Sequence, residues 1–113
     1  SLVFYCHNLG LVELRRYDNE QGRFTLVFLA APGDEDAQVE LTYNWGVEQY
    51  DLGSGYGHIA IEVDDVYEAT DAIKARGGKV LREAGPMNAG TTIIAFVEDP
   101  DGYPIELIGK RDR

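Results

Sequence analysis

Three segments of the chain alternate apolar and polar residues with a period of two, which is the pattern of a half-buried β-strand. They cover residues 38–43, 56–63 and 103–108. The first and the last each carry one glutamate, Glu40 and Glu106, between two apolar neighbours. The alternation sends each carboxylate to the face opposite the buried neighbours, where it needs a cation or a hydrogen-bond donor.

The middle segment places one histidine on a strand. Its alternation puts Tyr56, His58, Ala60 and Glu62 on one face and apolar residues on the other. A histidine on a strand is more often a structural residue than a ligand, so His58 alone indicates little. The two glutamate strands favour the functional interpretation, because three strands then each offer one group that binds cations.

The rest of the chain predicts shorter elements separated by turns. We expect helices over residues 1–8 and from Asp64 or Asp65 to about Arg76, since either aspartate suits a helix N-cap. Further strands are predicted at 11–16, 79–82 and 91–97, with a central, covered strand at 23–30. Residues 17–22 and 99–102 have the composition of turns, and 44–57 form the longest irregular segment.

The two halves of the chain repeat one order of elements. Residues 5–15 match 67–82, 24–30 match 92–98, and 39–41 match 105–107. Glu40 and Glu106 are therefore predicted to occupy equivalent positions of a duplicated unit. The counterpart of His58 falls before Ser1, so we expect the first unit to lack its opening strand. By symmetry, that strand would carry a fourth cation-binding group in addition to Glu40, His58 and Glu106.

Composition limits the functional classes. The chain has 113 residues, of which 44% are hydrophobic, and we expect one soluble domain. Ten Lys and Arg against twenty Asp and Glu give a net charge of −10, which argues against partners such as nucleic acid or an anionic membrane. No apolar run approaches the ~20 residues of a membrane span, and no signal peptide is evident, so we expect a cytoplasmic protein. The single cysteine, Cys6, is interpreted as a packing residue.

Two carboxylates and an imidazole make a mixed nitrogen and oxygen site. Nickel, cobalt, zinc, manganese or iron would suit it, and ligand type does not choose among them. Such a cation favours reactions that build negative charge on a substrate oxygen, because it stabilises an enediolate while a carboxylate moves the proton. In the plainer alternative, both glutamates only solvate strand edges and His58 is structural.

Three motifs carry a resemblance to a known family: residues 40–45 (ELTYNW), 56–60 (YGHIA), and 96–103 (FVEDPDGY) with Ile105 and Glu106. Together they resemble the glyoxalase I family of lactoylglutathione lyases, in the vicinal-oxygen-chelate superfamily. The resemblance covers the whole chain. It implies an α+β fold of two βαβββ modules, residues 1–48 and 55–113, that form a cupped mixed sheet.

The resemblance also implies a reaction and its residues. The reaction is the isomerisation of the methylglyoxal–glutathione hemithioacetal to S-lactoylglutathione, in a homodimer whose metal sites lie across the interface. Glu40, His58 and Glu106 match metal ligands, and Glu106 also matches the carboxylate that moves the proton. Asn44 matches a glutathione-binding position, and Arg82 falls near a basic position that contacts the tripeptide. The compact form resembles the bacterial type, which prefers nickel or cobalt, with zinc as the alternative.

The family's first strand, with one metal ligand and a substrate-anchoring arginine, would precede Ser1. We therefore expect either that the 113 residues are a fragment of a longer protein or that the activity of this protein is impaired. Two alternatives remain open within the superfamily: an epimerase or ring-cleaving dioxygenase, and a metal-free protein that binds a small molecule. Asn44 is harder to explain in the first, and the acidic ligands are harder to explain in the second.

Overall fold

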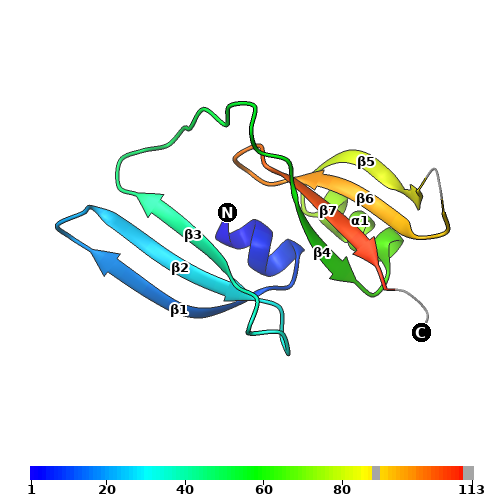
Figure 1. Cartoon of the computed structure of the whole chain (residues 1–113), viewed down its shortest axis with the longest axis horizontal. Helices are drawn as coiled ribbons and strands as arrows, with labels where there is room; N and C mark the ends of the chain where they lie inside the picture. The colour runs from blue at the N-terminus through cyan, green and yellow to red at the C-terminus, as the bar shows by residue number, and fades with distance from the viewer. Residues whose placement is uncertain (88–89, 111–113) are drawn as a thin grey trace. The chain divides into compact units, whose positions relative to one another are not determined.

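The computed structural model describes residues 1–87 and 90–110, which divide into two compact units, residues 1–51 and 52–113. The α+β class is confirmed (Figure 1). In chain order the elements are η1 (Val3–Asn8), β1 (Val12–Asn19), β2 (Phe24–Ala30), β3 (Val39–Asn44), β4 (Ile59–Val63), α1 (Val66–Ala75), β5 (Lys79–Pro86), β6 (Ile93–Glu98) and β7 (Pro104–Gly109). Among the described residues, no helix has the length and apolar character that crossing a membrane requires.

The first unit is a three-stranded antiparallel sheet in the order β1-β2-β3, together with η1. The prediction that residues 23–30 form a central strand is confirmed, and Val27 and Leu29 alternate into the core with at most 6% of their surface exposed. The predicted first helix is a single π-helical turn, in which the Leu9 amide donates to the Phe4 carbonyl oxygen at 3.1 Å. Phe4 and Tyr5 are its buried residues, each 4% exposed.

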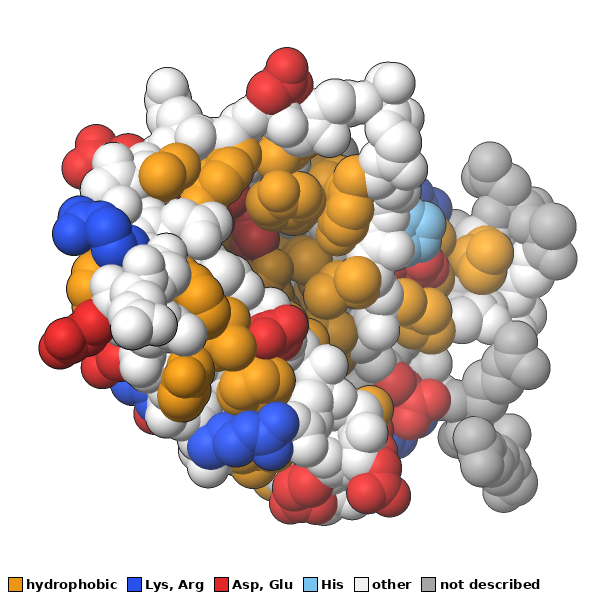
Figure 2. Space-filling view, turned by 60° about the vertical axis from the view of Figure 1, so that its left-hand side comes forward, with side chains coloured by type: hydrophobic (Ala, Val, Ile, Leu, Met, Phe, Trp, Pro, Cys, Tyr) orange, Lys and Arg blue, Asp and Glu red, His pale blue; other side chains and the backbone are white. Residues whose placement is uncertain are grey.

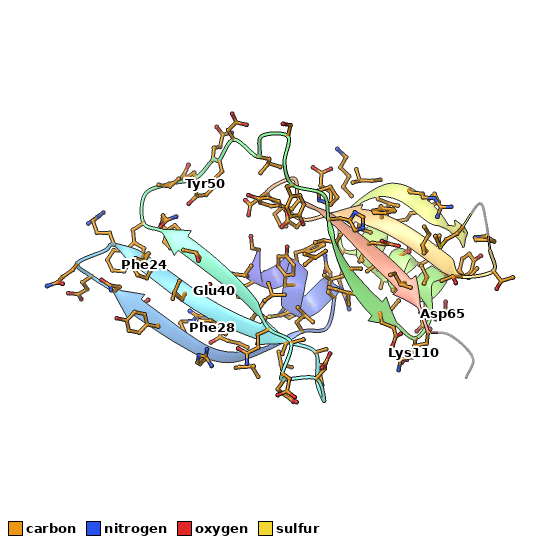
Figure 3. The ribbon with its side chains drawn as sticks, viewed as in Figure 1. Phe24, Phe28, Glu40, Tyr50, Asp65 and Lys110 are labelled. Carbon is orange, nitrogen blue, oxygen red and sulfur yellow. The ribbon has the colours of Figure 1, made fainter. Side chains whose placement is uncertain are left out.

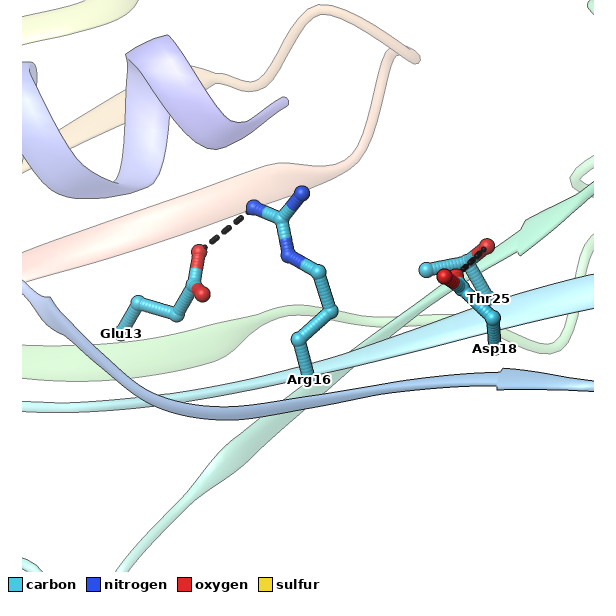
Figure 4. Close-up of polar contacts among 4 residues, drawn as sticks. All are labelled: Glu13, Arg16, Asp18 and Thr25. Atoms are coloured by element: carbon cyan, nitrogen blue, oxygen red, sulfur yellow. Dashed lines mark hydrogen bonds and ion pairs between the residues drawn. The ribbon is translucent and has the colours of Figure 1, made fainter.

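The predicted end of β1 at residue 16 is wrong, because the strand continues through Asn19. Its ladder with β2 extends over the residues expected to form a turn, and Asp18 lies opposite Thr25. The Thr25 hydroxyl donates to Asp18 Oδ1 at 2.7 Å, next to an ion pair between Arg16 and Glu13 (Figure 4). A cross-strand hydrogen bond therefore stabilises a segment that composition alone assigned to a turn.

The second unit is a four-stranded mixed sheet in the order β4-β7-β6-β5, in which only the β4–β7 pair is parallel. Helix α1 packs on the face of the sheet that carries the fully buried Ile105 and Leu107. From the helix, the buried Ile73 contributes to this core. Asp65 is the N-cap, since its Oδ1 accepts a hydrogen bond from the Glu68 amide at 3.1 Å. The helix and its aspartate cap are thus confirmed.

Several strand limits in this unit differ from the prediction, and β7 covers Pro104–Gly109 rather than residues 103–108. β5 continues to Pro86 because two irregularities in its register, next to Arg82, let it stay paired with β6. β6 begins at Ile93 rather than at residue 91. β4 begins at Ile59, so the prediction that His58 lies within a strand is wrong by one residue. The cupped arrangement of the two modules stays a prediction.

Candidate metal centre

One face of the second unit brings an imidazole and a carboxylate together. Ala60 lies opposite Glu106 in the parallel β4–β7 ladder, so their side chains share the face turned away from α1. His58 stands two residues before Ala60, and its Nε2 lies 2.9 Å from Glu106 Oε1. The His58 side chain is 42% exposed and that of Glu106 is 14% exposed, so the pair is open on the histidine side.

Phe96 packs against the imidazole ring of His58. It lies opposite Glu106 in the β6–β7 ladder, on the same face, and its ring meets the His58 ring edge to face at 5.1 Å between centroids. An aromatic contact of this kind contributes about 1 kcal/mol beyond its buried area. The phenylalanine thus limits the orientations in which His58 approaches the carboxylate.

Tyr56 ties the segment before β4 to β7. Its hydroxyl donates to the Pro104 carbonyl oxygen at 3.2 Å, and its ring packs edge to face against Tyr103 at 4.9 Å between centroids. Partial desolvation raises the pKa of the Tyr56 phenol, although the Ile59 amide acts in the opposite direction. The phenol therefore stays protonated at neutral pH and keeps its donor.

The donor atoms of His58 and Glu106 fit a divalent transition metal. An imidazole nitrogen with a carboxylate oxygen is a donor pair that nickel, cobalt and zinc accept. Neighbouring ligands of an octahedral ion with bonds of about 2.1 Å lie about 3.0 Å apart. The observed separation of 2.9 Å is close to that value. The two residues thus suit two ligand positions of one ion.

Glu40 belongs to the first unit, whereas His58 and Glu106 belong to the second. It lies on β3 opposite Phe28, with its side chain exposed on the sheet (Figure 3). Its carboxylate has no hydrogen-bond or ion-pair partner within residues 1–87 and 90–110, so it is available to a cation. In those same residues no three acidic, histidine or cysteine side chains cluster as a metal site. Of the predicted ligands, the structure brings together His58 and Glu106.

The two predicted substrate contacts already have partners in the chain. The Asn44 amide donates to the Tyr50 hydroxyl at 2.9 Å. The Arg82 guanidinium donates to three carbonyl oxygens beside the irregular part of β5, those of Ile94 at 3.1 Å, Pro86 at 3.0 Å and Gly85 at 3.5 Å. Their contacts with glutathione remain predictions.

A surface pocket of about 730 Å³ lies elsewhere in the second unit, at the start of α1. Its lining includes Asp64, Asp65 and Lys110, and neither His58 nor Glu106 contributes to it. Within it Lys110 Nζ and Asp64 Oδ1 form an ion pair at 2.7 Å, so its charges are largely satisfied. The convergence of donor atoms therefore locates the candidate centre better than pocket size does.

Sequence reasoning missed the parts played by Phe96 and Tyr56. The signal for Phe96 was present, because the repeat aligns it with Phe28 and the alternation of β6 puts it on the face of Glu106. Tyr56 was predicted to share the face of His58, but both residues precede β4, and the bond from Tyr56 to Pro104 depends on tertiary structure.

Comparison with known proteins shows the family of the chain. Residues 1–107 match the model of the Glyoxalase/Bleomycin resistance protein/Dioxygenase superfamily. A solved structure of glyoxalase I from Zea mays superposes with a TM-score of 0.92 at 47% identity over 98% of this chain. The chain spans 40% of the length of that maize protein.

Curated relatives are similar over nearly the whole chain. A lactoylglutathione lyase of Neisseria meningitidis is 60% identical over 98% of this chain and 81% of its own length. One from Escherichia coli O157:H7 is 53% identical over 99% of this chain and 84% of its own length. The fold, the paired donors and these matches lead to one conclusion: the chain belongs to the glyoxalase/bleomycin resistance protein/dioxygenase superfamily.

Proposed function

We propose that this chain is a lactoylglutathione lyase, a glyoxalase I, whose metal centre includes His58 and Glu106. It isomerises the hemithioacetal of methylglyoxal and glutathione to S-lactoylglutathione, which detoxifies methylglyoxal. Relatives that are 53% to 60% identical and bear that name support the activity. The observation that carries the site is the 2.9 Å approach of His58 Nε2 to Glu106 Oε1 on one face of the second sheet.

Glu106 is the residue that moves the proton. Its carboxylate takes the proton from the substrate carbon that bears sulfur and returns it to the neighbouring carbonyl carbon. The hydroxyl proton passes from the oxygen of the first carbon to the oxygen of the second, so the isomerisation gains and loses no atoms. The side chain is 14% exposed, with Phe96 beside it in the ladder, and this shelter limits exchange of the transferred proton with water. A general base of this kind typically contributes about 100-fold to 10,000-fold in rate.

His58, Glu106 and Glu40 would hold a divalent ion, with nickel or cobalt preferred and zinc the alternative. A bound ion supplies Lewis-acid stabilisation of the negative charge that develops on the substrate oxygens. Glu40 and the other two residues belong to different units of the chain. We infer that the three ligands meet across a two-fold homodimer interface, with Glu40 contributed by the second subunit. A fourth ligand, expected from the repeat, stays a prediction.

The substrate is an anion, and the chain carries a net charge of −10. Figure 2 shows acidic side chains at several separate places on one face, so the long-range field opposes substrate approach. Local groups have to offset that repulsion. Asn44 and Arg82 are the proposed contacts to glutathione. The Arg82 guanidinium also donates to three carbonyl oxygens of the chain. A cytoplasmic location is part of the same proposal.

Metal removal tests the proposal directly. Chelated and dialysed protein should lose hemithioacetal isomerisation, and nickel or cobalt should restore more of the rate than zinc. A His58→Ala variant, which removes one donor, should need a higher nickel concentration for the same recovery. Full turnover by metal-free protein would exclude the proposed centre. Small-molecule binding without any turnover at saturating nickel would favour a binding protein of the same superfamily.

A further inference from the structure

His58 lies outside the hydrogen-bonded part of its strand. The β4–β7 ladder begins with Ile59 opposite Ile105, one residue after the histidine. On the other side stands Gly57, and a Cβ placed on this glycine would meet no atom within 4 Å. Because glycine has more backbone freedom than other residues, the segment before β4 is free to move unless another contact holds it.

Tyr56 supplies such a contact. Its hydroxyl donates to the Pro104 carbonyl oxygen at 3.2 Å. Tyr56 precedes His58 by two residues, and Pro104 precedes Glu106 by two residues. The hydrogen bond therefore continues the pairing of the two segments past the end of the ladder, on the N-terminal side of both donor residues.

The ring of Tyr56 adds a second restraint to the same place. It packs edge to face on Tyr103, the residue before Pro104, at 4.9 Å between ring centroids. The Tyr103 hydroxyl has no hydrogen-bond partner in the described parts of the chain, residues 1–87 and 90–110. Within one aromatic pair, the phenol of Tyr56 thus joins two segments and that of Tyr103 does not.

We propose that Tyr56 is a positioning residue, whose hydrogen bond to Pro104 holds the segment before β4 so that His58 faces Glu106. Its role in metal binding rests on the proposed metal centre, whereas its role in ordering the segment does not. Groups that orient metal ligands typically affect affinity or activity by about 10-fold to 100-fold. Tyr56 acts through the backbone rather than on the imidazole itself. We therefore expect its loss to lower metal affinity by about 10-fold, the lower end of that range.

The test compares Tyr56→Phe with Tyr103→Phe in the full chain. Both keep the aromatic pair and remove one hydroxyl, but only the first removes the tie to Pro104. Nickel affinity, measured by competition with a chromophoric chelator, should fall about tenfold in Tyr56→Phe and stay near the original value in Tyr103→Phe. Amide hydrogen exchange at His58 in metal-free protein should become faster in Tyr56→Phe only.

The outcomes separate this inference from the proposed function. If the unsubstituted chain binds no nickel, the metal centre is wrong, while the exchange rates still decide whether Tyr56 orders the segment. If the unsubstituted chain binds nickel and Tyr56→Phe matches it in affinity and exchange, the positioning role is wrong. Equal changes in both variants would overturn it as well, because they would assign the effect to the ring pair rather than to the hydrogen bond.

Discussion

Glu40 and Glu106 occupy the same position in two copies of one antiparallel sheet. Glu40 lies opposite Phe28 in the β2–β3 ladder, and Glu106 lies opposite Phe96 in the β6–β7 ladder. The duplication predicted from sequence therefore holds at the level of single residue pairs. Glu106 alternates with the buried Ile105 and Leu107, and Glu40 alternates with the half-buried Val39 and Leu41, so each carboxylate projects from the opposite face of its strand.

The correspondence extends to a third strand and there reveals a difference. Arg15 lies opposite Phe28, and Arg82 lies opposite Phe96, each next to a register irregularity. The Arg15 guanidinium stacks on Phe28 at 4.0 Å from the ring centroid. The Arg82 guanidinium donates instead to carbonyl oxygens of β5 and β6. The two copies thus have an arginine at the same position, but the two arginines contact different partners.

The proposed dimer predicts complementation between two inactive variants. Glu40→Gln and Glu106→Gln should each lower turnover strongly when pure. In a mixed dimer, one site would combine both substitutions and the other would contain neither. Random mixing by refolding together should therefore restore about one quarter of the original turnover, since half of the dimers would carry one intact site of two.

A matched control is Glu106→Gln refolded with itself. If the three ligands came from one subunit, the mixture of variants would gain nothing over this control. Such a result, or full activity of a monomer in sedimentation, would contradict a site shared between subunits.

The Arg82 hydrogen bonds predict a loss of stability that Arg15 does not share. Arg82→Lys keeps the charge but loses the fork of donors that reaches the carbonyls of β5 and β6, so the free energy of unfolding should fall by about 1–3 kcal/mol. Arg15→Lys should change it by less than about 1 kcal/mol, because only the stacking on Phe28 is weakened. Urea denaturation checks both. If Arg82 also contacts glutathione, KM should rise in Arg82→Lys.

The helix cap gives a second stability prediction. Asp65 accepts a hydrogen bond from the Glu68 amide, whereas its neighbour Asp64 pairs with the exposed Lys110. Asp65→Ala should lower the free energy of unfolding by about 1 kcal/mol. Asp64→Ala removes only a surface ion pair and should cost less than about half of that. Thermal unfolding of the two variants measures the difference, and equal losses would mean that the cap is not the stabilising contact.

The fold and the paired donors were predictable to different degrees. The alternation of apolar and polar residues located three strands and the face of each glutamate, whereas the other strands were predicted from apolar runs between turns. The repeat then established the equivalence of Glu40 and Glu106. The local pattern does not show at which residue a strand begins to pair with its neighbour. For this reason His58 was wrongly assigned to a strand that begins at Ile59.

The remaining differences arise from contacts between strands and segments rather than from the pattern within one strand. β1 extends to a residue pair in which Thr25 donates to Asp18, seven residues away, and β5 extends past irregularities beside Arg82. The tie from Tyr56 to Pro104 spans 48 residues. The pattern along a single strand contains none of these contacts, so each one became visible only in the structure.

The central claim is that Glu106 moves the proton at the centre it shares with His58. Glu106→Gln keeps the size of the side chain and one ligand oxygen but removes the basic carboxylate. The measurement is kcat for hemithioacetal isomerisation at saturating nickel, with Glu62→Gln as the control, since Glu62 lies on the same face two residues beyond Ala60. We predict that kcat falls about 100-fold to 10,000-fold in Glu106→Gln and stays near normal in Glu62→Gln. Near-normal kcat in Glu106→Gln would contradict the account, because another group would then have to be the base.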